Sequence, residues 1–445
     1  MQFFKRLLTV AIAVNAALLY AVPQFIVKTD KPDAIYRCGE DIVITVQVMK
    51  EGKPLVGELI KYELNADGGI KKEGSYTTIA EPFVYKTKLD KPGALWMCFA
   101  LADKKGKRIK AAKPVSQFPY ISGWIGAVAE PEKIEAYFKR PAGFNDFWGK
   151  KRQELNNVPL KVLEKKLIHD DPKVRVWDIK VACSGPKPVS AYIAIPRNAK
   201  AKSCPAFVAY HGAGVGSCSM GQIIDKAKRG FIAMDVNAHG VVNGKPREFY
   251  QKLRNTEYKN YYSKVYEGVE SNYFVYMIVR VMRSLEYIKS VPEWNGKDLV
   301  VYGASQGGYQ SLIAASVDKD VTCSFAGVPG FADFGGEFFS DPKRMPRIHY
   351  GRALRNSKKD MEYIKARLEE LSYFDPVSFA PDIKCRTFIT VGFCDYSCPP
   401  TSVFSIYNAI PASTDKVIKV YPGSVHSKAP ADPKWIDYIN SLGKK

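Results

Sequence analysis

The first quarter of the chain alternates apolar and polar positions over short runs. One run is DIVITVQV at 41–48, and turn sequences such as Asp67-Gly68-Gly69 separate it from its neighbours. Alternation with a period of two is typical of half-buried strands, and helical periodicity is weak here. The pattern predicts a small all-β sandwich domain over residues 22–116.

A stretch with several Gly and Pro residues follows, and we expect residues 117–140 to be a linker. Apolar residues then recur at helical spacing, at Phe144, Trp148 and Leu155. This spacing predicts an amphipathic helix that opens a second domain, over residues 141–445.

Beyond Lys173 short apolar runs alternate with longer helical segments, among them a long one at about 272–288. This alternation predicts an α/β fold with a mostly parallel sheet and helices on both faces, as in α/β hydrolases. The candidate strands are VRVWDIKVAC, SAYIAIP, PAFVAYHG, GFIAMDVN, DLVVYGAS, VTCSFAGV, RTFITVGF and KVIKVYPG.

The N-terminus predicts export to the periplasm or the medium. Residues 1–21 carry Lys5 and Arg6 before an apolar run and small residues where a signal peptidase cuts. An uncleaved anchor is the alternative, but the run is short for a span and Asn15 interrupts it. No other segment is long and apolar enough to cross a membrane, so we expect no membrane span once the signal is removed.

Charge and cysteine content exclude several classes of partner and cofactor. The 66 basic and 45 acidic residues give a net charge of +21, but the lysines are scattered, so we expect no nucleic-acid partner. The nine cysteines are spread along the chain, and Cys394 and Cys398 have no His cluster beside them. A zinc site is therefore not expected.

The sharpest motif is Gly303-Ala304-Ser305-Gln306-Gly307, a G-x-S-x-G that follows an apolar strand and precedes a helical run. Such a strand-turn-helix elbow places a serine in a strained backbone conformation that needs small neighbours. We expect Ser305 to be the nucleophile of a serine hydrolase.

In this fold the order along the chain is Ser, then an acid, then His. Only His349 and His426 follow Ser305, and His426 comes directly after a predicted sheet strand, whereas His349 does not. Asp395 ends the preceding strand, and Asp333 is its competitor. We expect His426 to be the base and Asp395 the acid that orients it.

The tetrahedral intermediate also needs two hydrogen-bond donors. One should be the backbone N–H of Gln306, the residue after the nucleophile. The other should come from the loop after the third strand, and we assign it to Ala213. His211 in the same loop is expected to shape the turn.

Several motifs together resemble carbohydrate esterase family seven, the acetyl xylan esterases and cephalosporin C deacetylases. They are FKRPAGFNDFW, YHG, GASQGG, VPGFADF and LSYFDPVSFAPDIKCRTFITVGFCDYSCPPTSVFSIYNAI, within residues of about 135–440. The resemblance implies an α/β hydrolase whose triad corresponds to Ser305, Asp395 and His426. It implies no metal or organic cofactor.

Three departures from the family bear on the substrate. Its Arg-Gly-Gln is Asn237-Ala238-His239 here, its His-Glu is His426-Ser427, and Ala213 replaces a Tyr. We expect His239 and Phe331 to border the substrate pocket. Compact members, often hexameric, lack the N-terminal β domain, so a homo-oligomer is left as an open alternative.

These inferences predict an exported serine esterase that removes acetyl or other small acyl groups from acetylated polysaccharide or oligosaccharide. One alternative is a serine peptidase of the prolyl-oligopeptidase kind, whose elbow also accommodates Gly308-Tyr309. The other is a glycan-binding protein with a relic triad.

Overall fold

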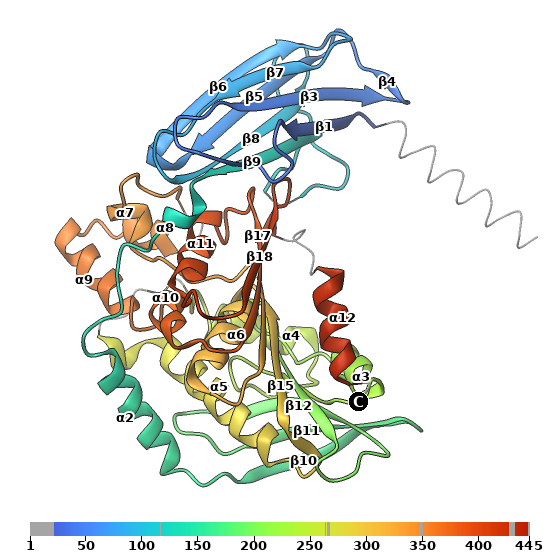
Figure 1. The fold of residues 1–445 in the computed structure, drawn as a ribbon, viewed down its shortest axis with the longest axis vertical. Coiled ribbons are helices and arrows are strands. Elements are labelled where there is room, and N and C mark those ends of the chain that lie inside the picture. The colour runs from blue at the N-terminus through green and yellow to red at the C-terminus, as the bar shows by residue number, and fades with distance from the viewer. Residues whose placement is uncertain are drawn as a thin grey trace, which may run out of the picture.

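The computed structural model describes residues 22–115, 117–262, 264, 268–346, 350–426 and 432–443. The signal peptide predicted over 1–21 lies outside them, as do His349 and Ser427. A β-rich N-terminal region is seated on one end of a larger α/β region (Figure 1). In the described part of the chain, no helix has the length and apolar character that a membrane span requires.

The N-terminal region consists of two sheets packed face to face, as the alternating pattern predicts. Every second residue of β3 is buried, which is the burial expected of a strand with one face on a core. The first sheet contains β1 (Gln24–Thr29), β3 (Ile42–Lys50), β4 (Lys53–Pro54) and β7 (Phe83–Thr87). The second runs in the order β2 (Ile35–Tyr36), β9 (Ser122–Ala129), β8 (Gly93–Ala102), β5 (Leu59–Ala66) and β6 (Ile70–Thr77).

The sandwich extends further along the chain than predicted. Strand β9 lies within the range 117–140 that was expected to be a linker, and it pairs with β8 along its length. Strand β8 is buried on both faces apart from the half-buried Trp96, because one face packs on the sandwich core and the other on the α/β region. The expected linker is therefore partly a sheet strand at the boundary between the two regions.

The α/β region is built on a nine-stranded sheet with the order β10-β11-β12-β14-β13-β15-β16-β17-β18. The pairs from β10 to β14 are antiparallel and those from β14 through β13 to β18 are parallel. The bounds are β10 (Val162–Asp170), β11 (Val174–Val181), β12 (Val189–Pro196), β13 (Cys204–Tyr210), β14 (Ile232–Val236), β15 (Trp294–Ala304), β16 (Cys323–Gly327), β17 (Arg386–Gly392) and β18 (Lys416–Tyr421).

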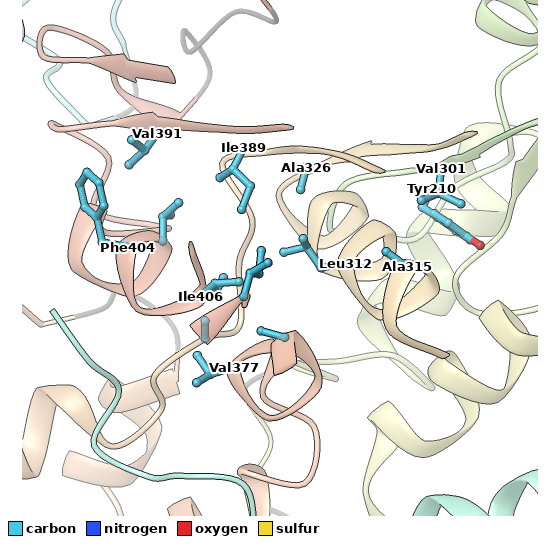
Figure 2. Packing of buried hydrophobic residues seen from close by; sticks show 14 of the residues in the cluster. Tyr210, Val301, Leu312, Ala315, Ala326, Val377, Ile389, Val391, Phe404 and Ile406 are labelled. Carbon is cyan, nitrogen blue, oxygen red and sulfur yellow. The ribbon is translucent and has the colours of Figure 1, made fainter. Parts of the chain in front are cut away.

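Helices cover both faces of this sheet (Figure 1). On one face α3 (Gly221–Lys228) and α12 (Pro433–Leu442) pack on the aromatic residues of the sheet. On the other lie α5 (Tyr273–Ser290), α6 (Gln306–Val317) and α11 (Pro400–Ala409). Figure 2 shows this second layer, where Leu312 and Phe404 lie near strand residues such as Ile389.

The remaining helices lie at the edges of this core. They are α2 (Phe144–Asn156), α4 (Arg247–Asn255), α7 (Gly336–Phe339), α8 (Tyr350–Arg355), α9 (Met361–Leu371) and α10 (Pro376–Phe379). Single 3-10 turns occur at Asp67–Gly69, Pro131–Lys133, Val269–Ser271 and Ala380–Asp382. The segment with α7 to α10 connects β16 to β17 and reaches the sandwich, where Asp67 accepts a hydrogen bond from the N–H of Met345 at 2.7 Å.

Candidate active site

Ser305 lies on a sharp turn between β15 and α6, as the motif predicts. Its backbone has φ 58° and ψ −121°, a conformation that residues other than glycine rarely adopt. A Cβ on Gly303 would overlap the backbone of Gly307, and a Cβ on Gly307 would overlap the carbonyl oxygen of Tyr210. The two glycines of the motif are therefore required by close backbone approach, and they leave the serine at the tip of the turn.

The structure brings Ser305, His426 and Asp395 together. The Nε2 atom of His426 lies 3.0 Å from Oγ of Ser305, and its Nδ1 atom lies 2.7 Å from Oδ2 of Asp395. His426 follows β18 and Asp395 follows β17, so neighbouring parallel strands deliver both side chains to the same edge of the sheet. The arrangement has the connectivity of a nucleophile, a base and an orienting acid.

The Asp395 carboxylate is held from its other side by the backbone. Its Oδ1 atom accepts hydrogen bonds from the N–H groups of Ser397 and Cys398, both at 2.9 Å, and the residue is 1% exposed. Asp333, the competing acid, instead accepts a hydrogen bond from the N–H of Tyr137. The described contacts thus distinguish the two candidate acids. Asp395 contacts the imidazole of His426, whereas Asp333 contacts the backbone of the segment that leads into the α/β region.

Burial by itself would lower the pKa of His426, because it favours the neutral imidazole. Hydrogen bonding to Asp395 and Cys398 outweighs burial, so the pKa is raised above its ordinary value. A carboxylate on Nδ1 fixes the tautomer that leaves Nε2 facing Ser305 and stabilises the imidazolium when it forms.

Cys398 was not predicted as a site residue. It lines the same pocket as Ser305 and His426. Its Sγ atom lies within 4.8 Å of a carboxylate oxygen of Asp395 and of a ring nitrogen of His426. Cys394, its partner in the C-x-x-x-C pattern, instead donates to the carbonyl oxygen of Pro422 and packs at the domain boundary. The C-x-x-x-C spacing could not predict which of the two cysteines lines the pocket, because the turn at Asp395 places their side chains in different surroundings.

A pocket of about 380 Å³ opens over Ser305. Phe331 lines it, as expected, together with two further aromatic residues, Tyr262 and Phe334. Ala213 also lines the pocket, so its small side chain shares the cavity with three aromatic residues supplied by other segments. Neither Tyr262 nor Phe334 was predicted to line the pocket. Tyr262 lies in no recognisable motif, and Phe334 ends the VPGFADF motif, which does not show which of its aromatic residues lines the pocket. The other lining residues are Gly212, Gly330, Ser397, Cys398 and His426.

Two backbone segments meet beside Ser305, and they contain the two predicted oxyanion donors. Gln306 begins α6, where N–H groups have no partner within the helix. In the other segment the N–H of Gly214 already donates to the hydroxyl of Tyr261 at 3.1 Å, and that hydroxyl donates to Oε1 of Gln306 at 2.6 Å. Tyr261 therefore ties both segments together, and the engagement of Gly214 favours the preceding N–H, that of Ala213, as the donor.

His239 occupies a different place from the one expected. It is 1% exposed and does not belong to the described pocket lining. Its Nε2 atom lies 2.9 Å from the carbonyl oxygen of Gly214, and its Nδ1 atom lies 2.6 Å from the hydroxyl of Tyr273. Burial, with His211 nearby, lowers the pKa of His239 to about 3, so the ring is neutral and donates to Gly214. His239 therefore hydrogen-bonds to the loop that carries Gly214 and lies outside the described pocket lining, in which it was expected.

His211 also shapes this loop, as the sequence predicts. Its Nε2 atom accepts a hydrogen bond from the N–H of Ala238 at 3.0 Å, and its Nδ1 atom lies 2.7 Å from the carbonyl oxygen of Gly212. Burial lowers the pKa of the ring, which fits a neutral imidazole that accepts on one nitrogen and donates on the other.

The N-terminal region contacts both loops that carry the base and the acid. The side chain of Gln117 donates to the carbonyl oxygen of Cys394 at 2.6 Å, next to Asp395. The indole of Trp124 donates to Gly423 at 2.9 Å, and the N–H of Gly126 donates to Pro422 at 2.8 Å, both on the loop before His426. The sequence pattern does not indicate these contacts, because every acceptor is a backbone carbonyl.

Comparison with known proteins identifies the family to which this chain is similar. The family model described as acetyl xylan esterase (AXE1) matches residues 130–437. The acetyl esterase Axe7A of Xylanibacter ruminicola is 26% identical over 394 residues, which cover 87% of this chain and 83% of the relative. That coverage reaches beyond the range of the family model into the N-terminal region.

Two solved structures share the fold. An acetyl xylan esterase from Paenibacillus sp. R4 matches with a TM-score of 0.58 and 20% identity, covering 71% of this chain and 98% of that one. Acetyl xylan esterase 1 from Thermoanaerobacterium sp. JW/SL YS485 matches with a TM-score of 0.59 and 19% identity, covering 71% and 97%. Since the family model spans well over half of the sequence, this chain belongs to the acetyl xylan esterase (AXE1) family and is a carboxylic ester hydrolase of the α/β-hydrolase fold.

Proposed function

We propose that this enzyme removes acetyl groups from acetylated xylan through an acyl-enzyme formed on Ser305. The observation that carries the proposal is the chain of contacts from Ser305 Oγ to His426 Nε2 and from His426 Nδ1 to Asp395, at the floor of an open pocket. Family membership favours this reading over the peptidase alternative. The intact contacts favour it over a relic binding protein.

The first half of the reaction forms the acyl-enzyme. His426 Nε2 takes the proton from Ser305 Oγ as the oxygen bonds to the acetyl carbonyl carbon. The negative charge moves to the carbonyl oxygen, where the N–H groups of Gln306 and Ala213 would stabilise it. The C–O bond to the sugar then breaks, and the sugar oxygen takes the proton from His426.

The second half releases acetate by the same route. His426 removes a proton from a water molecule, whose oxygen bonds to the acyl carbon and displaces Ser305 Oγ, which is protonated in turn. Asp395 keeps its negative charge throughout and holds the imidazole with Nε2 toward the reacting atoms. Each residue thereby returns to its starting state.

The substitution Ser305→Ala tests the nucleophile. It should abolish release of acetate from acetylated xylan and from 4-nitrophenyl acetate, with the thermal unfolding midpoint retained. Measurable turnover by the folded variant, well above the buffer blank, would overturn the assignment.

A matched pair of variants tests the acid. Asp395→Asn should lower kcat on the order of 10⁴-fold, because the amide stabilises the wrong tautomer of His426. Asp333→Asn is the control, since its carboxylate contacts Tyr137 and not the imidazole. If Asp333→Asn caused the greater loss in folded protein, the roles of the two acids would have to be exchanged.

We also propose that the enzyme is exported. The support is the basic start, apolar run and small residues of 1–21, all outside the described residues. N-terminal sequencing of protein from its native host should find a start between Ala17 and Gln24. A soluble product that begins at Met1 would contradict export.

A further inference from the structure

A second cavity, of about 310 Å³, lies where the N-terminal sandwich meets the α/β region. The sandwich contributes Asn65 and Lys71 from β5 and β6 and Trp96 from β8. The α/β region contributes Tyr396 and Pro399, which follow β17. Asp395 also lines this cavity, but the proposed reaction uses none of its other side chains.

The two cavities share one wall, the segment 395–399. Ser397 and Cys398 line the pocket over Ser305, whereas Tyr396 and Pro399 line the second cavity. Tyr396 and Ser397 are the partly exposed members of this segment, and the residues around them are buried. Consecutive Cα atoms are about 3.8 Å apart. Only one layer of chain therefore separates the second cavity from the active-site pocket.

The chemistry of the second cavity suits a sugar chain. Sugar residues present apolar C–H faces that pack on aromatic rings and hydroxyl groups that need hydrogen-bond partners, and sites with a few placed polar groups provide both. Trp96 and Tyr396 supply aromatic surface, and Asn65, Lys71 and Gln117 supply donors and acceptors. Trp96 is fixed by an edge-to-face contact with Phe118 at 5.3 Å, so little ordering is needed on binding.

We propose that this cavity binds backbone sugar residues of the same xylan chain whose acetyl group enters the pocket over Ser305. The proposal rests on the proposed function and extends it. The sandwich then forms part of the substrate site, and its contacts lie beyond the ester bond. Such remote contacts strengthen binding of a polymer and contribute nothing to a small ester that ends at the acetyl group.

The test compares two substrates in three variants. Trp96→Ala should lower kcat/KM for acetylated xylo-oligosaccharides roughly tenfold, mainly through KM, because it removes the main aromatic surface. The kcat/KM for 4-nitrophenyl acetate should stay within about twofold of wild type. Asn65→Ala, at a half-exposed position, should act in the same direction if Trp96→Ala does not fold. Trp177→Ala is the matched control, since Trp177 is partly exposed on β11 and outside both cavities.

A binding measurement separates this proposal from the proposed function. Unacetylated xylohexaose should bind the inactive Ser305→Ala protein in calorimetry, and Trp96→Ala in that background should abolish or strongly weaken binding. Wild-type protein that releases no acetate from xylan would refute the proposed function. Equal losses on both substrates, or unchanged values for both Trp96→Ala and Asn65→Ala, would overturn the sugar site, as would xylohexaose binding that Trp96→Ala leaves intact.

Discussion

His239 stands at a position where the resembling family has Gln, and its contacts suggest that it acts by positioning the loop that supplies an oxyanion donor. The ring donates to the carbonyl of Gly214 while Tyr261 accepts from the N–H of the same residue. Gly214 is thus held at both its polar backbone groups. A small displacement of the donor lowers the rate, because its stabilisation of the transition state depends on its distance from the developing negative charge.

We predict that His239→Ala lowers kcat for 4-nitrophenyl acetate by on the order of tenfold to a hundredfold, somewhat less than removal of an oxyanion donor costs. KM should change little, because the ring lies outside the described pocket lining. His239→Gln should recover much of kcat, since its amide can also donate to Gly214. The control is His169→Ala on β10. A raised KM with unchanged kcat would instead mean that His239 contacts substrate.

Asp235 on β14 is buried, and burial raises its pKa to about 7. Its Oδ2 atom accepts from the N–H of Ser219, but its Oδ1 atom has no hydrogen-bond partner among the described residues. The native state therefore holds this proton more tightly than the unfolded chain, whose carboxyl has the ordinary value of 3.8. Stability from this group is complete below about pH 4 and is lost as the pH rises through about 7.

Asp235→Asn should therefore reduce the drop in thermal unfolding midpoint between pH 4.5 and pH 8. At about 1.4 kcal/mol per pKa unit, the effect on the free energy of unfolding is on the order of a few kcal/mol. The exposed Asp225 provides a control, Asp225→Asn, that should keep the wild-type difference. Equal drops in wild type and Asp235→Asn would show that Asp235 is charged in the native state at both pH values.

Among the elements, those with strong patterns were predictable and those with polar or mixed sequences were not. All eight candidate strands of the large sheet are present, because each is an apolar run or, as in β11 and β18, an alternating run bounded by turn residues. Strand β10 was missed, since it is largely exposed and its residues Glu164, Lys165 and Lys166 give no apolar signal. Strand β9 was assigned to a linker because its glycines, at 123 and 126, are typical of loops.

The candidate site divides in the same way. The elbow, the chain order and the strand ends were enough to select Ser305, Asp395 and His426, which the structure places in contact. Tyr261, Tyr262 and Cys398 could not be selected, because their roles depend on where long connections fold back over the sheet. Such placement depends on tertiary packing, which local periodicity does not encode.

Strand β9 supports the loop that carries His426 through a hydrogen bond from Trp124. Removal of this one donor tests whether the support matters for activity. Trp124→Phe keeps the aromatic ring but loses the indole N–H that donates to Gly423. We expect a decrease of about 1 kcal/mol in the free energy of unfolding and a several-fold lower kcat for 4-nitrophenyl acetate. Trp177→Phe on β11 should leave both values unchanged. A Trp124→Phe enzyme with wild-type kcat would show that the loop keeps its geometry unaided.

At the scale of the whole molecule, the sandwich and the α/β region share a boundary made of apolar side chains and backbone hydrogen bonds. Cys98 and Phe118 from the N-terminal side pack with Cys394 and Val425 beside the candidate acid and base. Ion pairs and hydrogen bonds add to this contact, including Lys91 with Asp341. We therefore expect the two regions to fold as one cooperative unit.

Deletion of residues 22–129 should lower activity on 4-nitrophenyl acetate at least tenfold and promote aggregation, because it exposes Phe393 and Val425 and removes the donors to both loops. The solved relatives provide the contrast, since they are covered almost whole by part of this chain. A soluble truncated enzyme with wild-type kcat would mean that the α/β region of this protein does not need the sandwich.

The hydrogen bonds from Gln117, Trp124 and Gly126 all end on main-chain carbonyl groups, which any residue would supply in their place. The residues whose carbonyl groups accept these hydrogen bonds therefore do not need a particular side chain. Substitutions at 422–424 should accordingly lower the free energy of unfolding less, on average, than substitutions at the donor positions 117 and 124. The loops before His426 and Asp395 are therefore able to change sequence at the accepting positions while the sandwich holds their backbone in place.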